Sequence, residues 1–177
     1  MAPSADSLRP LALNAVNTTS IQPMGASLAL GLSRSAWPLL QQLQQAGLAD
    51  RVGLTPLAAA ALQTTPSDLL VAPASQLLSD QWLRGGPTIV IGAMGAVTRL
   101  IAPLLSDKQH DPAVLVMDAN AQNIVPLIGG HAAGAEQLAH ALACALGGQV
   151  VLTGDAASQE RLALDTFGEA WGWVRGG

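Results

Sequence analysis

The hydrophobic pattern is clearest in the middle of the chain. An apolar run at Thr88–Ile91 predicts a buried strand, and it is followed by glycines and then by apolar residues at helical spacing. Pro103 falls late in that helix and removes a backbone hydrogen bond, so we expect the helix to end or kink there. Two further apolar runs, 113–118 and 123–128, are separated only by residues 119–122 and predict a β-hairpin. The residues of the helix expected to face the core are Val97, Leu100, Ile101 and Leu104.

Strands and helices alternate along the rest of the chain. Further strands are predicted at residues 10–16, 51–54, 68–72 and 149–153. Further helices are predicted from Ser33 or Ser35 to Gly47, and at residues 57–62, 75–83, 134–146 and 157–171. This alternation predicts an α/β fold with a mostly parallel, three-layer Rossmann-like sheet and one β-hairpin. We expect residues 1–32 to form an N-terminal extension with the first strand, and residues 33–177 to form the α/β domain.

Composition narrows the class of protein. Hydrophobic residues make up 50% of the chain and charged residues only 11%, so a membrane protein has to be considered. The longest stretch without a charged side chain lies between Arg9 and Arg34, but Asn14, Asn17 and other polar residues interrupt it. A spanning helix needs about 20 mostly apolar residues. We therefore expect a soluble, cytoplasmic protein without a membrane partner.

Charge and cysteine content exclude further classes. The net charge is -4, from 12 acidic and 8 basic residues, and the Lys and Arg residues form no cluster, so nucleic acid is not expected as a partner. The single cysteine, Cys144, has no second thiol for a disulfide or a metal site. Because it lies in an Ala/Leu-rich helical pattern, we expect it to be a small buried residue.

Three blocks of the sequence, in order, resemble the N-terminal domain of the cobalt-precorrin-5A hydrolases of anaerobic vitamin B12 synthesis. The first block, GAMGAVTRLIAPLLSDKQHDPAVLVMD, is similar to the family's M-A-T-G-I-x-V-R-x-I-A-P-x-L-x-D-K-x-x-D-P-A-V-V-V-x-D. The second, PLIGGHAAGAEQLA, resembles S-G-H-x-G-G-A-N-x-L-A, and the third, QVVLTGD, resembles a V-I-T-T-A strand. The resemblance covers a core of residues 88–153 and implies the same α/β fold.

The chain departs from the family's pattern at four positions. Met94 stands where the family has Thr, Gly129 where it has Ser, Ala133 where it has Gly, and Glu136 where it has Asn. Any role that the family gives to that Ser hydroxyl or that Asn amide is therefore in doubt for this chain.

The resemblance implies a reaction in cobalamin biosynthesis, in which a δ-lactone on the corrin-ring precursor is opened and acetaldehyde is released. Such chemistry needs a base to activate water and donors for the developing oxyanion. His131 is the candidate base, since it lies in a glycine cluster at the start of a helix whose N–H groups can hold an anion. The alternative is that His131 only caps that helix or closes a turn.

The other candidates line the two glycine-bearing loops. Arg99 is a candidate ligand for a substrate carboxylate, and its alternative is an ion pair with a nearby aspartate. Glu136 could pair with His140 one helical turn away, or lie on a solvated face. The candidate substrate-binding residues are Gly92, Met94, Gly95, Arg99, Gly129, Gly130, Gly134 and Glu136, and the candidate structural residues are Asp107, Asp111 and Asp118.

No intrinsic cofactor or metal is expected, because the aspartates are not joined by His or Cys at ligand spacing. Cobalt enters only as part of the substrate, a cobalt-precorrin. The resemblance also implies a further C-terminal domain, either the rest of a hydrolase or a precorrin-3B methyltransferase, to which a similar leader is fused in some bacteria. A non-catalytic domain that binds the intermediate or supports such a methyltransferase is the competing interpretation, and a homodimer stays open.

Overall fold

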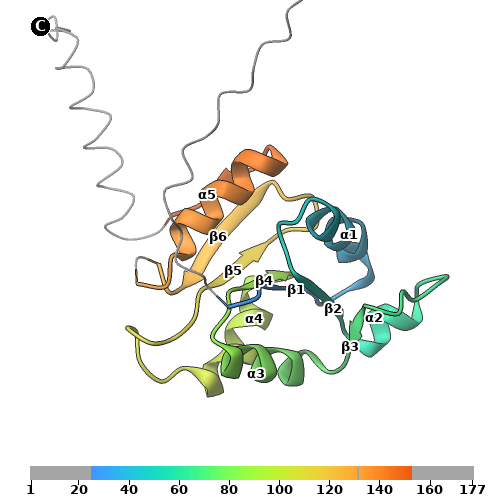
Figure 1. Cartoon of the computed structure of the whole chain (residues 1–177), viewed down its shortest axis with the longest axis horizontal. Coiled ribbons are helices and arrows are strands. Elements are labelled where there is room, and N and C mark those ends of the chain that lie inside the picture. The colour runs from blue at the N-terminus through green and yellow to red at the C-terminus, as the bar shows by residue number, and fades with distance from the viewer. Residues whose placement is uncertain (1–24, 131, 153–177) are drawn as a thin grey trace, which may run out of the picture.

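One sheet forms the centre of the molecule (Figure 1). The computed structural model describes residues 25–130 and 132–152. Within these residues seven strands lie in the order β3-β2-β1-β4-β5-β6-β7. The strands are β1 (Leu28–Gly31), β2 (Arg51–Leu54), β3 (Leu70–Val71), β4 (Thr88–Ile91), β5 (Val114–Met117), β6 (Asn123–Ile128) and β7 (Gln149–Val150). The α/β class and the mostly parallel sheet predicted from the sequence are confirmed.

Strand direction changes once in the sheet, at the predicted hairpin. β1, β2, β3, β4 and β5 run parallel, β6 pairs antiparallel with β5, and β7 runs parallel to β6. In the registers, Val114 pairs with both Thr88 and Ile128, whereas Met117 pairs with Ile91 and Ile124. We call the side on which β1, β4 and β5 end the carboxyl edge, and the side on which they begin the amino edge. β6 therefore starts at the carboxyl edge and ends at the amino edge.

Helices cover both faces of the sheet (Figure 1). On one face lie α1 (Trp37–Gln45), which follows the short 3-10 helix η1 (Arg34–Ala36), and α5 (Ala135–Leu146). On the other face lie α3 (Ala74–Arg84) and α4 (Met94–Ile101), the latter continued by η2 (Ala102–Leu104). The short helix α2 (Pro56–Ala60) connects β2 to β3 at the end of the sheet.

The sequence of β4 shows how the strands supply both cores. All four residues of β4 are buried, with Ile89 and Ile91 in the cluster that contains α1 and α5, and Val90 in the cluster that contains α3 and α4. Side chains alternate between the two faces of a strand, so a strand covered on both sides has to be apolar throughout. This explains why the apolar run in the sequence coincides with the bounds of β4.

Local signals set the ends of three helices, although α2 (Pro56–Ala60) begins and ends before the predicted 57–62. Pro56 occupies the first turn of α2 and needs no intrahelical hydrogen-bond donor there. Gly85 ends α3 with φ +67, a left-handed conformation that favours glycine. α4 gives way to a 3-10 turn that contains Pro103, because proline cannot donate the next helical hydrogen bond.

Strands β1, β3 and β7 differ most from their predicted bounds, and β7 is only Gln149–Val150 where 149–153 was predicted. β1 lies upstream of residue 33, where the α/β domain was expected to begin, and it occupies the middle of the sheet between β2 and β4. Its segment was not recognised because turn-forming residues precede it and no clear period is present. β3 is only Leu70–Val71, shorter than the predicted 68–72. The strand predicted at 10–16 and the helix predicted at 157–171 lie outside the described residues.

The prediction that Cys144 is a buried residue of α5 was wrong. Cys144 is a free, exposed thiol and not a buried residue, and Ala145 is exposed as well. Ala143 is buried in their place. In an alanine-rich helix most positions look apolar, so the sequence identifies the buried face poorly. Across the residues that the structure describes, no helix combines the length and the apolar character that crossing a membrane requires.

Candidate functional site

The carboxyl edge holds the point where the chain leaves the sheet in opposite directions. After β1 the chain passes through η1 and α1 to β2 on one side, and after β4 it passes through α4 to β5 on the other. In open α/β sheets ligands bind outside the carboxyl ends of the strands at such a switch point. The first glycine-bearing loop, which follows β4, lies at this point.

Gly92 brings the two loops at the switch point into contact. A Cβ atom on Gly92 would lie 2.8 Å from Cδ1 of Leu32, the first residue after β1. The loops are also tied to the sheet, because Leu32 N donates to Ile91 O at 3.1 Å and Gly92 N donates to Met117 O at 3.1 Å. The glycine is therefore needed for close packing between the loops. Gly95 is different, since the nearest atom to its Cβ position is Nη1 of Arg99 at 3.8 Å.

Arg99 folds back toward the start of its own helix. Its Nη1 donates to Gly95 O at 3.4 Å, and its side chain is exposed. The alternative of an ion pair with Asp107, Asp111 or Asp118 is wrong, because no such pair of Arg99 occurs among the described residues. Arg99 remains a cation at the carboxyl edge. Met94, the first residue of α4, is 44% exposed.

Arg34 is a second cation at this edge, and it was not among the predicted site residues. It begins η1 and is exposed. The signal that could have found it is its place shortly after the strand β1, which was itself not recognised. The sequence alone did not place any strand end near Arg34.

The second glycine-bearing loop lies at the opposite, amino edge. It follows the end of β6, where Ile128 pairs with Val114 at the start of β5. A Cβ atom on Gly129 would come within 3.1 Å of Cα of Ala113, the residue that precedes β5. Gly129 and Gly134 have φ values of +75 and +74, which glycine adopts without strain. His131 lies between them and outside the described residues, so its role as a base stays a prediction.

The amide groups at the start of α5 already have partners. Ala133 N and Ala135 N both donate to Gly129 O, at 3.1 and 3.2 Å, and Glu136 N donates to Gly130 O at 3.4 Å. These groups are therefore not available to hold an anion in this conformation, unlike the free N–H groups expected from the sequence. The loop closes on itself and caps the helix.

The side chain of Glu136 lies over this loop. A Cβ atom on Gly130 would fall 2.8 Å from Oε1 of Glu136, so the glycine leaves room for the carboxylate. Glu136 belongs to the first turn of α5, where a negative charge interacts favourably with the helix dipole. Its pairing with His140, which is exposed on the same helix, stays a prediction.

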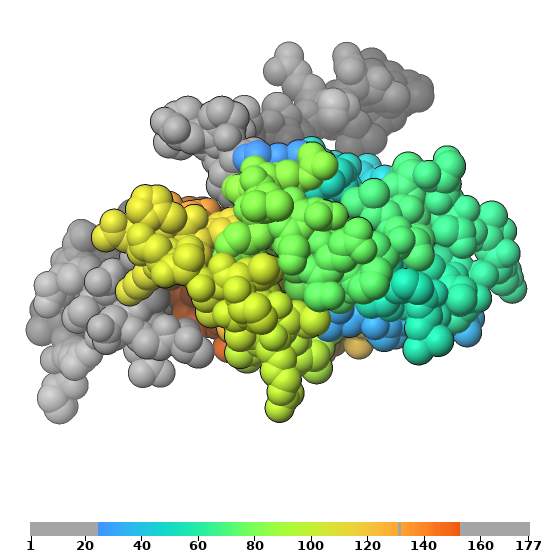
Figure 2. Space-filling model, turned by 90° about the horizontal axis from the view of Figure 1, so that it is seen from below, coloured from blue at the N-terminus to red at the C-terminus, as the bar shows by residue number. Residues whose placement is uncertain are grey.

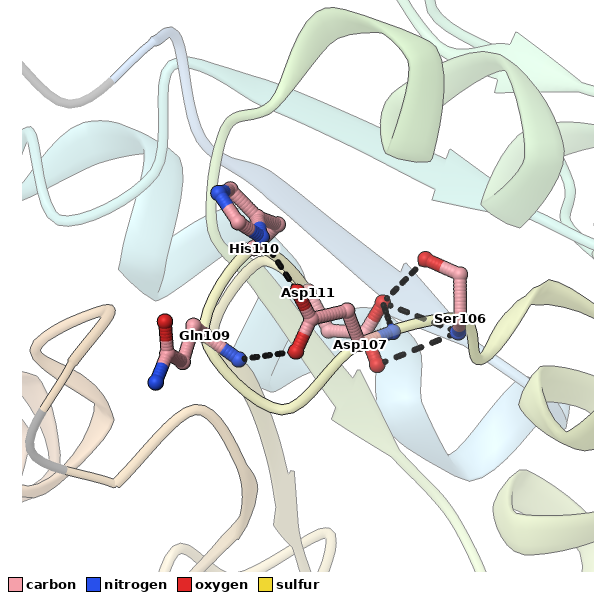
Figure 3. A network of polar contacts seen from close by, with 5 residues as sticks. All are labelled: Ser106, Asp107, Gln109, His110 and Asp111. Carbon is pink, nitrogen blue, oxygen red and sulfur yellow. Dashed lines mark hydrogen bonds and ion pairs between the residues drawn. The ribbon is translucent and has the colours of Figure 1, made fainter.

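The turn before β5 lies at the amino edge as well and is built on two aspartates (Figure 3). Asp111 is only 6% exposed and accepts hydrogen bonds from N and Oγ of Ser106, each at 3.1 Å. Asp107 accepts a hydrogen bond from Gln109 N at 3.0 Å and contacts Nδ1 of His110 at 2.5 Å. The Gln109 amide, and after it the His110 side chain, hold the pKa of Asp107 below its usual value. Both aspartates thus accept the hydrogen bonds that shape this turn.

Asp118 has the corresponding role in the β-hairpin. Its carboxylate accepts hydrogen bonds from Asn120 N, Gln122 N and Asn123 N, at 3.0, 3.2 and 2.7 Å. Burial on its own raises the pKa of Asp118, but these amide groups outweigh that effect, so the pKa is lowered overall. Asp118 is therefore a structural residue of the turn between β5 and β6.

The described residues bring the candidates together in two places and not one. The loop with Gly92, Met94, Gly95 and Arg99 lies at the carboxyl edge, and the loop with Gly129, Gly130, Gly134 and Glu136 lies at the amino edge. The sequence predicted both loops as one set of substrate-binding candidates, but in this conformation the two loops lie at opposite edges of the sheet. The reason is the antiparallel hairpin, which carries the chain across the sheet before the second loop. Within the described residues, no three His, Cys, Asp or Glu side chains are grouped so that they could hold a metal ion.

The sequence of α3 to β7 has relatives among known proteins. Residues 76–156 match the family described as cobalamin synthesis G N-terminal. This segment belongs to that family. Two proteins named cobalt-precorrin-5A hydrolase are similar to the chain, one from Priestia megaterium with 42% identity over 86 residues and one from Salmonella typhimurium with 46% identity over 79 residues. The matches cover 49% and 45% of this chain.

Coverage of the relatives is limited. The matches take in 23% of the Priestia protein and 22% of the Salmonella protein, so this cobalamin synthesis G N-terminal segment corresponds to about a quarter of either. The fold has a counterpart in the crystal structure of a cobalamin biosynthesis protein G homologue from Sulfolobus solfataricus, with a TM-score of 0.51 and 17% identity. That similarity covers 73% of this chain and 36% of the other. It therefore includes parts of the fold outside residues 76–156.

Proposed function

We propose that the chain acts in cobalamin biosynthesis, as part of a protein that hydrolyses the ring-A δ-lactone of cobalt-precorrin-5A with release of acetaldehyde. The observation that carries the proposal is the similarity of its α3–β7 segment to two proteins named cobalt-precorrin-5A hydrolase. The fold supports it, because the same arrangement occurs in a cobalamin biosynthesis protein G homologue. Cobalt belongs to the substrate in this reaction and is not a cofactor held by the protein.

Lactone hydrolysis places two demands on the protein. A base has to take a proton from water as the water attacks the carbonyl carbon, and donors have to stabilise the negative oxygen that forms. We propose His131 as the base, since it is the histidine of the glycine-rich loop at the start of α5. The amide groups of Ala133, Ala135 and Glu136 are occupied by loop carbonyls, so the oxyanion donors have to come from elsewhere or from an opened loop.

The test is an acetaldehyde assay with cobalt-precorrin-5A. We expect the protein to release acetaldehyde and the His131→Ala variant to lose this activity. His110→Ala is the matched control, because His110 lies on the neighbouring turn at the amino edge and pairs with Asp107. Activity that survives His131→Ala, or that depends equally on His110, would contradict the assignment of the base.

The second candidate function is a non-catalytic domain that binds the corrin intermediate, or supports an attached precorrin-3B C(17)-methyltransferase. Two observations favour it. The glycine at position 129 carries no hydroxyl where the family has Ser, and the first amide groups of α5 are capped internally. Tight binding of cobalt-precorrin-5A without any release of acetaldehyde, by the chain alone and by the whole gene product, would establish this function instead.

A further inference from the structure

Two arginines lie at the switch point on the carboxyl edge, one on each of the loops that meet there. Arg34 begins η1, which follows β1, and Arg99 lies in the last turn of α4, the helix that follows β4. The loops are in contact, since a Cβ atom on Gly92 would lie 2.8 Å from Leu32 Cδ1. In Figure 2 the blue segment that follows β1 and the yellow-green of α4 meet along the lower edge of the molecule. Both side chains are exposed, so both guanidinium groups are accessible.

The position of the Arg99 guanidinium is partly fixed. Its Nη1 donates to Gly95 O at 3.4 Å, which keeps the charge beside the first turn of α4 and does not let it extend away along the helix. One bond to a carbonyl leaves the other guanidinium donors free. The planar fork of an arginine can then accept a carboxylate through two parallel hydrogen bonds.

No carboxylate neutralises these arginines within the part of the chain that the structure describes. The one ion pair found there joins Asp107 and His110 at the amino edge. Asp118 is the aspartate on the carboxyl edge, but its oxygens accept the amide groups of the hairpin turn. The local charge at the switch point is therefore positive in a protein whose net charge is -4.

The start of α4 adds donors of the right kind. Among the described residues, no acceptor is found for the amide groups of Met94 and Gly95. The start of α5 offers no such donors at its first two positions, because Ala135 N and Glu136 N are bonded to Gly129 O and Gly130 O. Free amide groups and the positive end of the helix dipole favour an anion at α4.

We propose that Arg34 and Arg99, with the Met94 and Gly95 amides, form an anion site that binds carboxylate groups of the substrate. We name it the carboxyl-edge site. The identity of these carboxylates rests on the proposed function, in which they are the acetate and propionate arms of the tetrapyrrole. The site orients the macrocycle by its rim and takes no part in bond breaking. Two separated arginines suit a ligand with several carboxylates better than a small anion.

The test is a binding titration of the full chain with uroporphyrin, a tetrapyrrole that carries acetate and propionate arms and has no lactone. We expect binding that weakens with salt, because exposed charges are screened. Arg34→Gln and Arg99→Gln are each expected to weaken it about tenfold or more, as for a hydrogen bond to a charged group. Arg99→Lys should restore only part of the affinity, because it keeps the charge and loses the fork.

Arg84→Gln is the matched control. It removes the same charge from an exposed arginine at the end of α3, which leads into the amino edge of the sheet. We expect less than about a twofold change in affinity for this exposed, distant charge. The site would be overturned if all three variants lost affinity for uroporphyrin equally. It would also be overturned if Arg34→Gln and Arg99→Gln lost no affinity. Inorganic phosphate that displaces uroporphyrin at an equal concentration would overturn it as well.

The outcome separates this site from the proposed reaction. Uroporphyrin binding that depends on Arg34 and Arg99, in a protein that releases no acetaldehyde from cobalt-precorrin-5A, supports the site and contradicts the hydrolase. Acetaldehyde release at the wild-type rate and KM by the Arg34→Gln/Arg99→Gln variant supports the hydrolase and contradicts the site. Absence of uroporphyrin binding to the wild-type chain also contradicts the site.

Discussion

The methyl group of Ala133 occupies the space that a side chain on Gly129 would need: a Cβ atom placed on Gly129 would lie 2.8 Å from Cβ of Ala133. The related hydrolase family carries the opposite pair, with Ser at the first position and Gly at the second. We therefore expect the two departures from the family pattern to be coupled, because there is room for one side-chain carbon between these positions and either residue can supply it.

This coupling predicts the effect of restoring the family residues. Gly129→Ser alone should lower the free energy of unfolding by about 1–3 kcal/mol, because it adds a clash to a residue with positive φ. Adding Ala133→Gly should recover part of the loss, with a coupling of at least about 0.5 kcal/mol in a double-mutant cycle. Urea unfolding of the four proteins measures this, and strictly additive effects would show that the two positions are independent.

Asp118 gives the protein a predictable dependence on pH. Its pKa in the folded protein lies below the usual value of 3.8, so its contribution to stability is complete above that pH and is lost as the pH falls through the lowered pKa. Asp118→Asn should lower the free energy of unfolding at pH 7 by about 1–2 kcal/mol, since it replaces charge-assisted hydrogen bonds. Urea titrations at neutral and acidic pH test this. The difference between the variant and the wild type should shrink as the pH falls, and a constant difference would contradict the role of the charge.

Asp111 is predicted to matter more for stability than an exposed aspartate on a helix surface. Asp111→Ala removes a buried carboxylate that accepts hydrogen bonds from N and Oγ of Ser106, and it should cost about 1–3 kcal/mol. Asp80→Ala on the exposed side of α3 is the control for loss of an acidic residue and should change stability by less than about 0.5 kcal/mol. Thermal or urea unfolding distinguishes the two, and a neutral Asp111→Ala would show that the turn does not depend on this carboxylate.

The exposed thiol of Cys144 is directly testable. It should react with a thiol reagent such as dithionitrobenzoate in the folded protein at a rate within about tenfold of the unfolded chain, because access does not require unfolding. A Cys144→Ser variant provides the blank, since Cys144 is the single cysteine of the sequence. Protection that disappears only on unfolding would mean that this side of α5 is covered in solution.

The sequence predicted those elements whose own residues determine them. β4 and the β5–β6 hairpin have apolar runs bounded by Pro, Gly or turn residues, and the end of α4 follows from Pro103. β1 could not be found in this way. Its LALG segment acquires strand geometry because β2 and β4 pair with it on both sides, and these partners are distant in sequence. The residues of the segment itself do not indicate that β2 and β4 will pair with it.

The candidate site was predicted in its parts and not in its arrangement. The loops around Gly92 and Gly129 were located correctly, but their distribution over two edges depends on the direction of β6. Arg34 was missed because its significance depends on β1. The ion-pair alternative for Arg99 failed because Asp111 lies at the opposite edge of the sheet and Asp118 accepts hydrogen bonds within its own turn. Hydrogen-bond competition of this kind is decided by backbone geometry, which residue spacing does not supply.

The central position of β1 has a consequence for synthesis of the protein. β1 can pair with β2 soon after both have left the ribosome, but its other side stays open until Thr88–Ile91 has been made. The β5–β6 hairpin needs only its immediate neighbours. Long-range pairing is slow and leaves a strand edge exposed while it waits. We therefore expect nascent chains that stop between β2 and β4 to require chaperones, and chains that extend beyond β4 to become protected along the whole sheet at once.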